Sequence, residues 1–289
     1  WQTIITMIVV MTAGTSVVMW LGELITDRGV GNGMSILIFT SIAAGFPSNL
    51  WSIRLQKGLF AFIFVIAVGI LVVAAVVFVE QAQRRIPVQY AKRMVGRQSY
   101  GGTSTYIPIK VNQAGVIPVI FASSLLLMPL TLVQFAGQSA TQDSQTGDII
   151  LGITNALQHG SPLYMSLYAL GIIFFCFFYT AVVFNPEETS ENLKRHGGFV
   201  PGIRPGKNTE TYLDYVLTRI TVVGAAYLTL VCLVPEFMFS SLGFVAIGGT
   251  SLLIVVNVTM DTVTQIQSHL LAHQYGDLIK KAKLKGGRR

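Results

Sequence analysis

Apolar runs long enough to cross a membrane alternate with polar segments along this chain of 289 residues. A helix needs about 20 apolar residues to cross the ~30 Å hydrocarbon core of a bilayer. The sequence predicts seven spans, at about residues 3–21, 34–45, 58–79, 114–135, 162–184, 216–234 and 242–260. The second is short and could extend into the segment 47–51. Glycines in the segment 28–33 predict a sharp turn between the first two spans, and the last two are expected to form a hairpin around Pro235-Glu236. The pattern is typical of an all-α polytopic membrane protein.

Composition agrees with this class, because 52% of the residues are hydrophobic and only 11% are charged. The two cysteines, Cys176 and Cys232, both lie in apolar runs. We therefore interpret them as small buried hydrophobic residues and not as a disulfide pair.

Two long polar segments, residues 81–113 and 185–215, separate the spans. The first carries six basic residues and no acidic residue between Gln81 and Asn112. Apolar and polar residues alternate around Val88 and Tyr106, which predicts short strands. Such a basic segment could bind a polyanion or an acidic protein surface. The alternative is that its charge reflects only the preference for Lys and Arg in cytoplasmic loops.

The distribution of basic residues predicts the orientation of the chain. Alternating spans leave only Arg54 and Lys57, of the 20 Lys and Arg residues, on one side of the membrane. By the positive-inside rule the other side, with both polar segments and the tail 266–289, is cytoplasmic. The chain begins at Trp1 without methionine and is apolar within a few residues, so we expect a fragment. An odd number of spans with a cytoplasmic C-terminus puts its first residue outside.

The sequence offers little support for an enzyme. It has no phosphate-binding loop, nucleophile elbow or HExxH motif, so we expect neither catalytic residues nor a cofactor. His269 and His273 are spaced to share a metal, but no third ligand is near, and we expect no metal site.

Ion-coupled transporters usually carry ionisable groups inside their spans, whereas here charges fall near span ends. A secondary transporter using Asn257, Thr259 and Asp261 remains the alternative function. A third possibility is an insertase or scaffold that only presents its polar loops.

Several motifs in order resemble one known family. The strings are GNGMSILIF, AGVIPVIFASS, FFYTAVVFNPEETSENLK, FVPGIRPG and GGTSLLIVV. They are similar to segments of the SecY family, whose members are the central subunits of the bacterial protein-conducting channel. The resemblance runs from about the fourth transmembrane helix of the family to its C-terminus. The resemblance implies ten helices arranged as two five-helix halves related as inverted repeats.

On this resemblance the chain divides into four parts. Residues 1–45 would be the last two helices of the N-terminal half, and 46–57 an external hinge loop. Residues 58–265 would be the C-terminal five-helix half with cytoplasmic loops 81–113 and 185–215, followed by the basic cytoplasmic tail 266–289.

The resemblance also implies a function and a set of site residues. Such a channel passes unfolded secretory polypeptides and releases hydrophobic segments sideways into lipid. Its aliphatic pore ring would consist of Ile38, Ile42, Ile120 and Ile254. Its lateral gate would include Ser124, Met128 and Pro129 on the helix 117–130.

The two polar loops resemble the family's docking surface for the SecA motor ATPase and for ribosomal RNA. The basic residues implied are Arg84, Arg85, Lys92, Arg93, Arg97 and Arg204. Glu187 departs from the pattern, because a basic residue is expected there in many relatives. Further implied partners are SecE-like and SecG-like membrane subunits and secretory and membrane-protein precursors, in the bacterial inner membrane.

Overall fold

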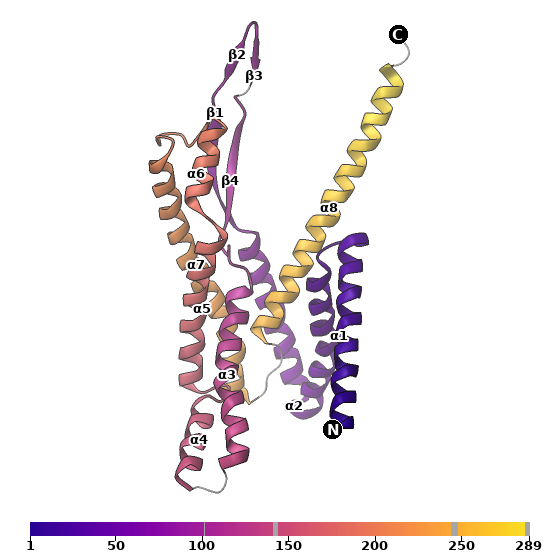
Figure 1. Cartoon of the computed structure of the whole chain (residues 1–289), viewed down its shortest axis with the longest axis vertical. Helices are drawn as coiled ribbons and strands as arrows, with labels where there is room; N and C mark the ends of the chain where they lie inside the picture. The colour runs from indigo at the N-terminus through magenta and orange to yellow at the C-terminus, as the bar shows by residue number, and fades with distance from the viewer. Residues whose placement is uncertain (101, 141–143, 244–247, 287–289) are drawn as a thin grey trace. The chain divides into compact units, whose positions relative to one another are not determined.

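The structure is a computed structural model that describes residues 1–100, 102–140, 144–243 and 248–286 (Figure 1). Its helices are α1 (Gln2–Arg28), α2 (Gly33–Gln81), α3 (Ile117–Ala140), α4 (Ser144–Ala156), α5 (Pro162–Val183), α6 (Pro186–Arg195), α7 (Lys207–Leu242) and α8 (Gly249–Gly286). Its strands are β1 (Gln83–Tyr90), β2 (Arg93–Val95), β3 (Gln98–Tyr100), β4 (Ser104–Lys110) and β5 (Gly198–Phe199). The chain forms two compact units, residues 1–56 with 251–289, and residues 57–250.

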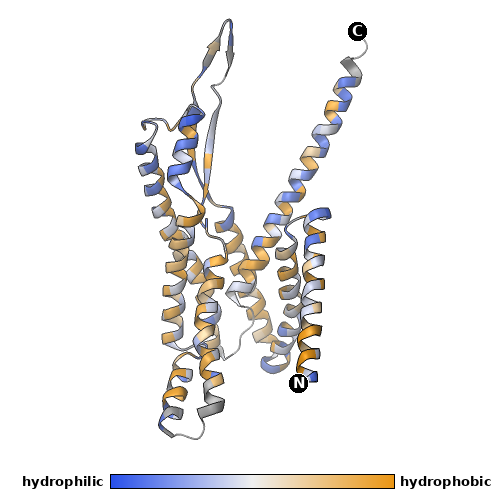
Figure 2. Ribbon diagram, in the orientation of Figure 1, coloured by the Kyte–Doolittle hydropathy of each residue, from blue (hydrophilic) through white to orange (hydrophobic). Residues whose placement is uncertain are grey.

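Five of the described helices, α1, α2, α3, α5 and α7, contain stretches long and apolar enough to cross a membrane. Apolar residues follow one another along these helices, whereas α6 and the outer part of α8 carry many polar residues (Figure 2). Helix α2 is 49 residues long and holds the second and third predicted spans. Helix α8, which contains residues 249–260 of the seventh predicted span, is not among these five helices, and polar residues such as Asn257 and Asp261 interrupt it.

In the first unit, α1 and α2 meet at the predicted glycine turn. Gly31 has a φ of +88°, which a residue with a side chain rarely adopts. The Gly33 amide donates to Thr26 Oγ1 at 2.9 Å, and the Met34 amide donates to Asn32 Oδ1 at 3.2 Å. A Cβ on Gly33 would overlap the carbonyl oxygen of Gly22, so the two helix ends can approach this closely only at glycine.

The prediction of an external loop at residues 46–57 is wrong, because these residues continue α2 as a helix. Apart from Pro47, the segment contains ordinary helix-forming residues and none of the glycines that end helices. The helix is interrupted instead at Gly58, whose φ of 87° and ψ of 179° are not helical. This break lies next to the boundary between the two units at residues 56 and 57. The boundary at residues 250 and 251 groups α8 with α1, whereas the resemblance assigned the last span to the C-terminal half.

In the second unit, α3, α5 and α7 pack side by side. One expectation here is also wrong. The hairpin at Pro235-Glu236 does not form, because α7 continues through Pro235 to Leu242 and ends at Gly243, which has a φ of 72°. A proline removes only one backbone hydrogen bond of a helix, a loss that membrane helices tolerate. Between α3 and α5 lies the amphipathic helix α4.

The strands predicted in the basic segment are present. Strand β1 pairs antiparallel with β4, from Gln83 opposite Lys110 to Gln89 opposite Ser104. The short strand β5, from the second polar segment, pairs with the end of β1, so the sheet order is β4-β1-β5. A separate β2–β3 hairpin extends this segment (Figure 1).

Candidate functional site

The two polar segments form one structure, which we call the basic platform: β1 to β5, α6 and the loop 200–206. Inward-facing residues alternate along the strands, as in a sheet with one buried face. They form a core with α6 and the beginning of α7, made of Ile86, Val88, Ile109, Leu193, Val200, Leu213, Val216 and Leu217. Segments about 100 residues apart in the sequence are thus held together by a common apolar core.

The basic side chains predicted for docking lie on the exposed surface of this platform. Arg84, Arg85, Lys92 and Arg97 are exposed. The Arg85 guanidinium lies 4.8 Å from the ring centroid of Tyr106 on the paired strand, a cation–π contact that orients it. Arg93 lies in β2, and its side chain is outside the described residues.

Arg204 is presented by a loop whose backbone is fixed. Residues Val200 to Ile203 form a tight turn in which the Ile203 amide donates to the Val200 carbonyl at 3.1 Å. Pro201 and Gly202, with a φ of +81°, occupy the positions that a type II turn requires. After this turn, Arg204 is exposed while its own carbonyl accepts a hydrogen bond from Thr209 Oγ1 at 3.0 Å.

A second side chain fixes the end of the same loop. The Ser190 hydroxyl of α6 donates to the Gly206 carbonyl at 2.7 Å. Ser190 and Thr209 are only 4% and 2% exposed, so both hydrogen bonds are shielded from water. These two hydrogen bonds hold the backbone on both sides of the exposed Arg204 side chain.

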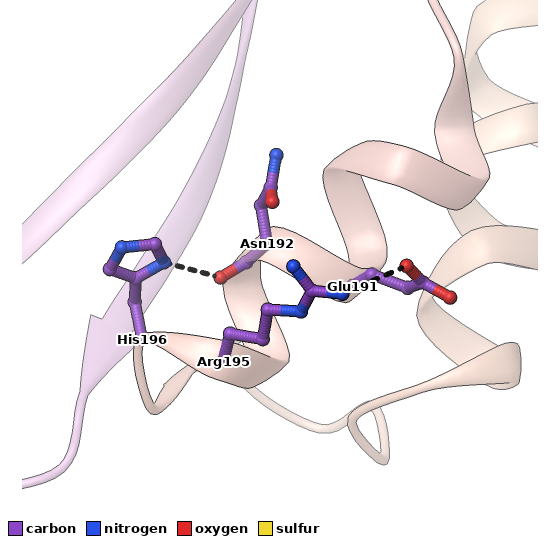
Figure 3. A network of polar contacts seen from close by, with 4 residues as sticks. All are labelled: Glu191, Asn192, Arg195 and His196. Carbon is purple, nitrogen blue, oxygen red and sulfur yellow. Dashed lines mark hydrogen bonds and ion pairs between the residues drawn. The ribbon is translucent and has the colours of Figure 1, made fainter.

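Helix α6 follows the usual rules for helix ends. Asn185 caps it by accepting a hydrogen bond from the Glu187 amide, and the acidic residues of the first turn suit the positive end of the helix dipole. Figure 3 shows its last turn, where the His196 ring contacts the Asn192 carbonyl at 2.7 Å and Arg195 pairs with Glu191 at 3.9 Å. An acidic Glu187 is therefore favourable here for a local reason.

A polar network joins the platform to the apolar helices. Asn112, which is 4% exposed, donates to Glu80 Oε1 at 2.8 Å and to the Gly115 carbonyl at 3.3 Å. Tyr227 of α7 donates to the same Glu80 oxygen at 3.4 Å. Beside it, a Cβ on Gly224 would overlap the Val111 carbonyl oxygen. Sequence analysis missed this network, although Glu80 at the end of an apolar run was a visible signal.

The residues expected in the pore ring lie on three helices. Ile38 and Ile42 are one turn apart on α2, and Ile254 lies on α8 in the same unit. Ile120 lies on α3 in the other unit and is 42% exposed. The geometry of a ring made by all four is therefore still a prediction.

The expected gate residues all lie on α3. Ser124, Met128 and Pro129 are exposed. Ser124 Oγ donates to the Ile120 carbonyl of its own helix at 2.9 Å. The sequence analysis did not identify Tyr168 on α5, which contacts the neighbouring Ser123.

Potential metal ligands are sparse in the part of the chain that the structure describes. No group of three or more His, Cys, Asp or Glu side chains is found there. His273 Nδ1 lies 3.6 Å from Asp277 Oδ2 on exposed α8.

Comparisons with known proteins identify relatives along nearly the whole chain. A family model described as SecY matches residues 2–263. The protein translocase subunit SecY of Streptomyces scabiei is 58% identical over 285 residues, which are 96% of this chain and 64% of that protein. The corresponding subunit of Escherichia coli K12 is 51% identical over 287 residues, or 97% of this chain and 64% of that protein. The chain thus spans 64% of the length of these two curated relatives.

Two solved structures have a similar fold. One is a SecY protein described for the plug domain that stabilises the closed state of its translocation channel, with a TM-score of 0.58 and 20% identity, covering 88% of this chain and 64% of that one. The other is described as a protein-conducting channel, with a TM-score of 0.57 and 20% identity, covering 88% and 63%. The apolar helices, the folded polar segments and the family match lead to one conclusion: this chain is a multi-pass membrane protein and belongs to the SecY family.

Proposed function

We propose that this chain is the channel-forming part of a protein translocase, which passes unfolded secretory polypeptides across the membrane and releases hydrophobic segments sideways into lipid. The relatives bear the name protein translocase subunit, and one structural neighbour is described as a protein-conducting channel. The observation that carries the proposal is the basic platform, where two distant segments share one core and present exposed arginines.

The platform is suited to binding a partner that is acidic or rich in phosphate. Its exposed arginines are held by local contacts, Arg85 by Tyr106 and the Arg204 loop by two buried hydroxyls. Side chains on a fixed backbone lose less conformational entropy on binding. We infer that a SecA motor ATPase and ribosomal RNA dock here, with the platform and the tail of α8 in the cytoplasm of a bacterial cell and the helices in its inner membrane.

The membrane helices would form the channel itself. Ile38, Ile42, Ile120 and Ile254 would line its narrowest part, because aliphatic side chains exclude water and ions while yielding to a passing chain. Ser124, Met128 and Pro129 would form one wall of the gate toward lipid. The apolar side chains exposed on the outer helices provide surface for lipid and for SecE-like and SecG-like subunits.

Charge reversal at Arg204 tests the docking proposal. In the full-length protein with its partner subunits, Arg204→Glu should lower motor-driven export at least tenfold while the amount of protein in the membrane is unchanged. A tenfold effect corresponds to about 1.4 kcal/mol, which is modest for a charged docking contact.

The matched control is Arg195→Glu on the same platform. Arg195 is 75% exposed and pairs only weakly with Glu191 at 3.9 Å. Export should be nearly unchanged in this variant. Equal export in both variants, at the level of the unmodified protein, would exclude Arg204 as a docking residue.

A further inference from the structure

Two neighbouring serines on α3 have different surroundings. Each hydroxyl lies 2.9 Å from the carbonyl four residues earlier, Ser123 from Val119 and Ser124 from Ile120. Ser124 is exposed, whereas Ser123 is partly buried and its Oγ also lies 3.3 Å from Tyr168 Oη on α5. Of these two serines, only Ser123 therefore contacts another helix.

Tyr168 makes a second contact of the same kind. Its hydroxyl lies 3.2 Å from Thr250 Oγ1 in the first turn of α8. The side chain is 5% exposed, so its hydroxyl is largely withdrawn from the outer surface of the protein. One buried hydroxyl thus connects α3, α5 and the beginning of α8.

The hydroxyl contact continues a seam of three contacts between α3 and α5. Phe121 stacks on Phe175, with ring centroids 5.7 Å apart. One residue further along α3, a Cβ added to Gly171 would lie 3.3 Å from the Ala122 Cβ. Small residues let two helices approach closely, and here they bring Ser123 within reach of Tyr168. The packing of α3 against α5 therefore positions the contact between Ser123 and Tyr168.

The hydroxyls border a cavity of about 230 Å³. Ser123, Tyr168 and Thr250 contribute to its wall, together with Glu236 and His159. A water molecule occupies roughly 30 Å³ of liquid, so the cavity has room for several. A hydroxyl that loses its protein partner here can bind water instead, and the contact can therefore open and close at low cost.

We propose that Tyr168 is a positioning residue, a hydroxyl latch that holds α3 against α5 and sets the resting position of the gate wall. The inference rests on the proposed function, in which Ser124, Met128 and Pro129 of α3 border the lateral exit. Without the latch, α3 would occupy a wider range of positions. A channel with a less defined gate wall would discriminate less well between precursors with and without a signal sequence.

The latch can be tested by measuring the distance between α3 and α5 directly. Spin labels at Leu132→Cys and Leu170→Cys, which replace side chains 62% and 64% exposed, would report it in the full-length protein in bilayers. Tyr168→Phe and Ser123→Ala should each raise the population of displaced α3 about two- to tenfold, as expected for the loss of one hydrogen bond. The double variant should not exceed Tyr168→Phe, because that single change already removes the Ser123–Tyr168 contact.

Thr131→Ala is the matched control, since it removes an exposed α3 hydroxyl that donates to the Leu127 carbonyl of its own helix and is not among the gate residues. Its distance distribution should equal that of the labelled parent. If Tyr168→Phe and Ser123→Ala also equal the parent, the latch does not exist.

Export of a precursor without a signal sequence, measured on the same variants, separates the two proposals. Increased export together with displaced α3 supports both the latch and the gate. Displaced α3 with unchanged export would support the latch and overturn the role of α3 as the gate wall.

Discussion

Apolar side chains are buried in the basic platform but exposed on helix α1. In the platform, Ile109 and Ile86 are 0% and 1% exposed, within a core that the chain builds for itself. In α1, Ile8 is 60% exposed and Gly22 is the buried residue. A hydrophobic side chain on α1 must be covered by lipid or by another subunit, whereas one in the platform is covered by its own chain. Apolar residues therefore stabilise the platform by packing within the chain, whereas those on α1 need lipid or another subunit to cover them.

The same substitution in both regions should have very different effects. Ile109→Ala should destabilise the platform by about 2–5 kcal/mol, because it leaves a cavity in a closed core. Ile8→Ala should have a much smaller effect, since lipid or detergent fills the space. Hydrogen exchange of the β1 and β4 amides, measured on the purified protein, would report the loss of platform stability. Similar protection of these strands in both variants would contradict the account of a self-contained core.

A glycine pair sharpens the comparison at the level of the backbone. Gly224→Ala would push a methyl group into the Val111 carbonyl, and overpacking of this kind costs about 1–3 kcal/mol. Gly14→Ala in α1 has nothing within 4 Å, so it should be neutral or stabilise the helix by roughly 0.5–1 kcal/mol. In detergent, the midpoint of thermal unfolding should be lower for Gly224→Ala than for the parent, and equal or higher for Gly14→Ala. The reverse order would contradict the close approach of α7 to Val111.

The smallest effect is expected at the loop that presents Arg204. Ser190→Ala removes the hydrogen bond to the Gly206 carbonyl and should cost about 1 kcal/mol, which corresponds to roughly fivefold faster amide exchange in residues 200–206. Thr211→Ala is the control, because the Thr211 hydroxyl bonds only to the Lys207 carbonyl of its own helix. Equal exchange in the two variants would mean that Ser190 does not fix the loop.

The class of the protein and the position of most of its helices follow from the sequence, because length and apolar composition are enough to predict a span. The strands of the basic platform were also predictable, since their alternation reflects one buried face. The pairing of β1 with β5 was not, because the register of Gln89 opposite Phe199 joins distant segments. Pairing of this kind depends on the fold and leaves no local pattern.

Errors in the sequence analysis occurred where a local signal was too weak to decide the structure. Pro235 suggested the end of a span, but one proline among apolar residues did not break α7. Residues 46–57 were expected to form a loop because of the family resemblance, although the segment contains no glycine that would end a helix and continues α2. Of the site residues, Arg204 could be proposed from its glycine and proline neighbours. Tyr168 could not, because its importance depends on where Ser123 and Thr250 lie in space.

The most direct test of the central proposal is crosslinking from Ile120 in native membranes. A photoreactive residue at this position, in the full-length protein with a secretory precursor stalled in transit, should form an adduct with the precursor. The adduct should disappear when the precursor lacks its signal sequence, and a probe at Ile8 on α1 should react with lipid or a neighbouring subunit. Lipid adducts at Ile120 without any precursor adduct would contradict the proposal that α3 lines a protein-conducting channel.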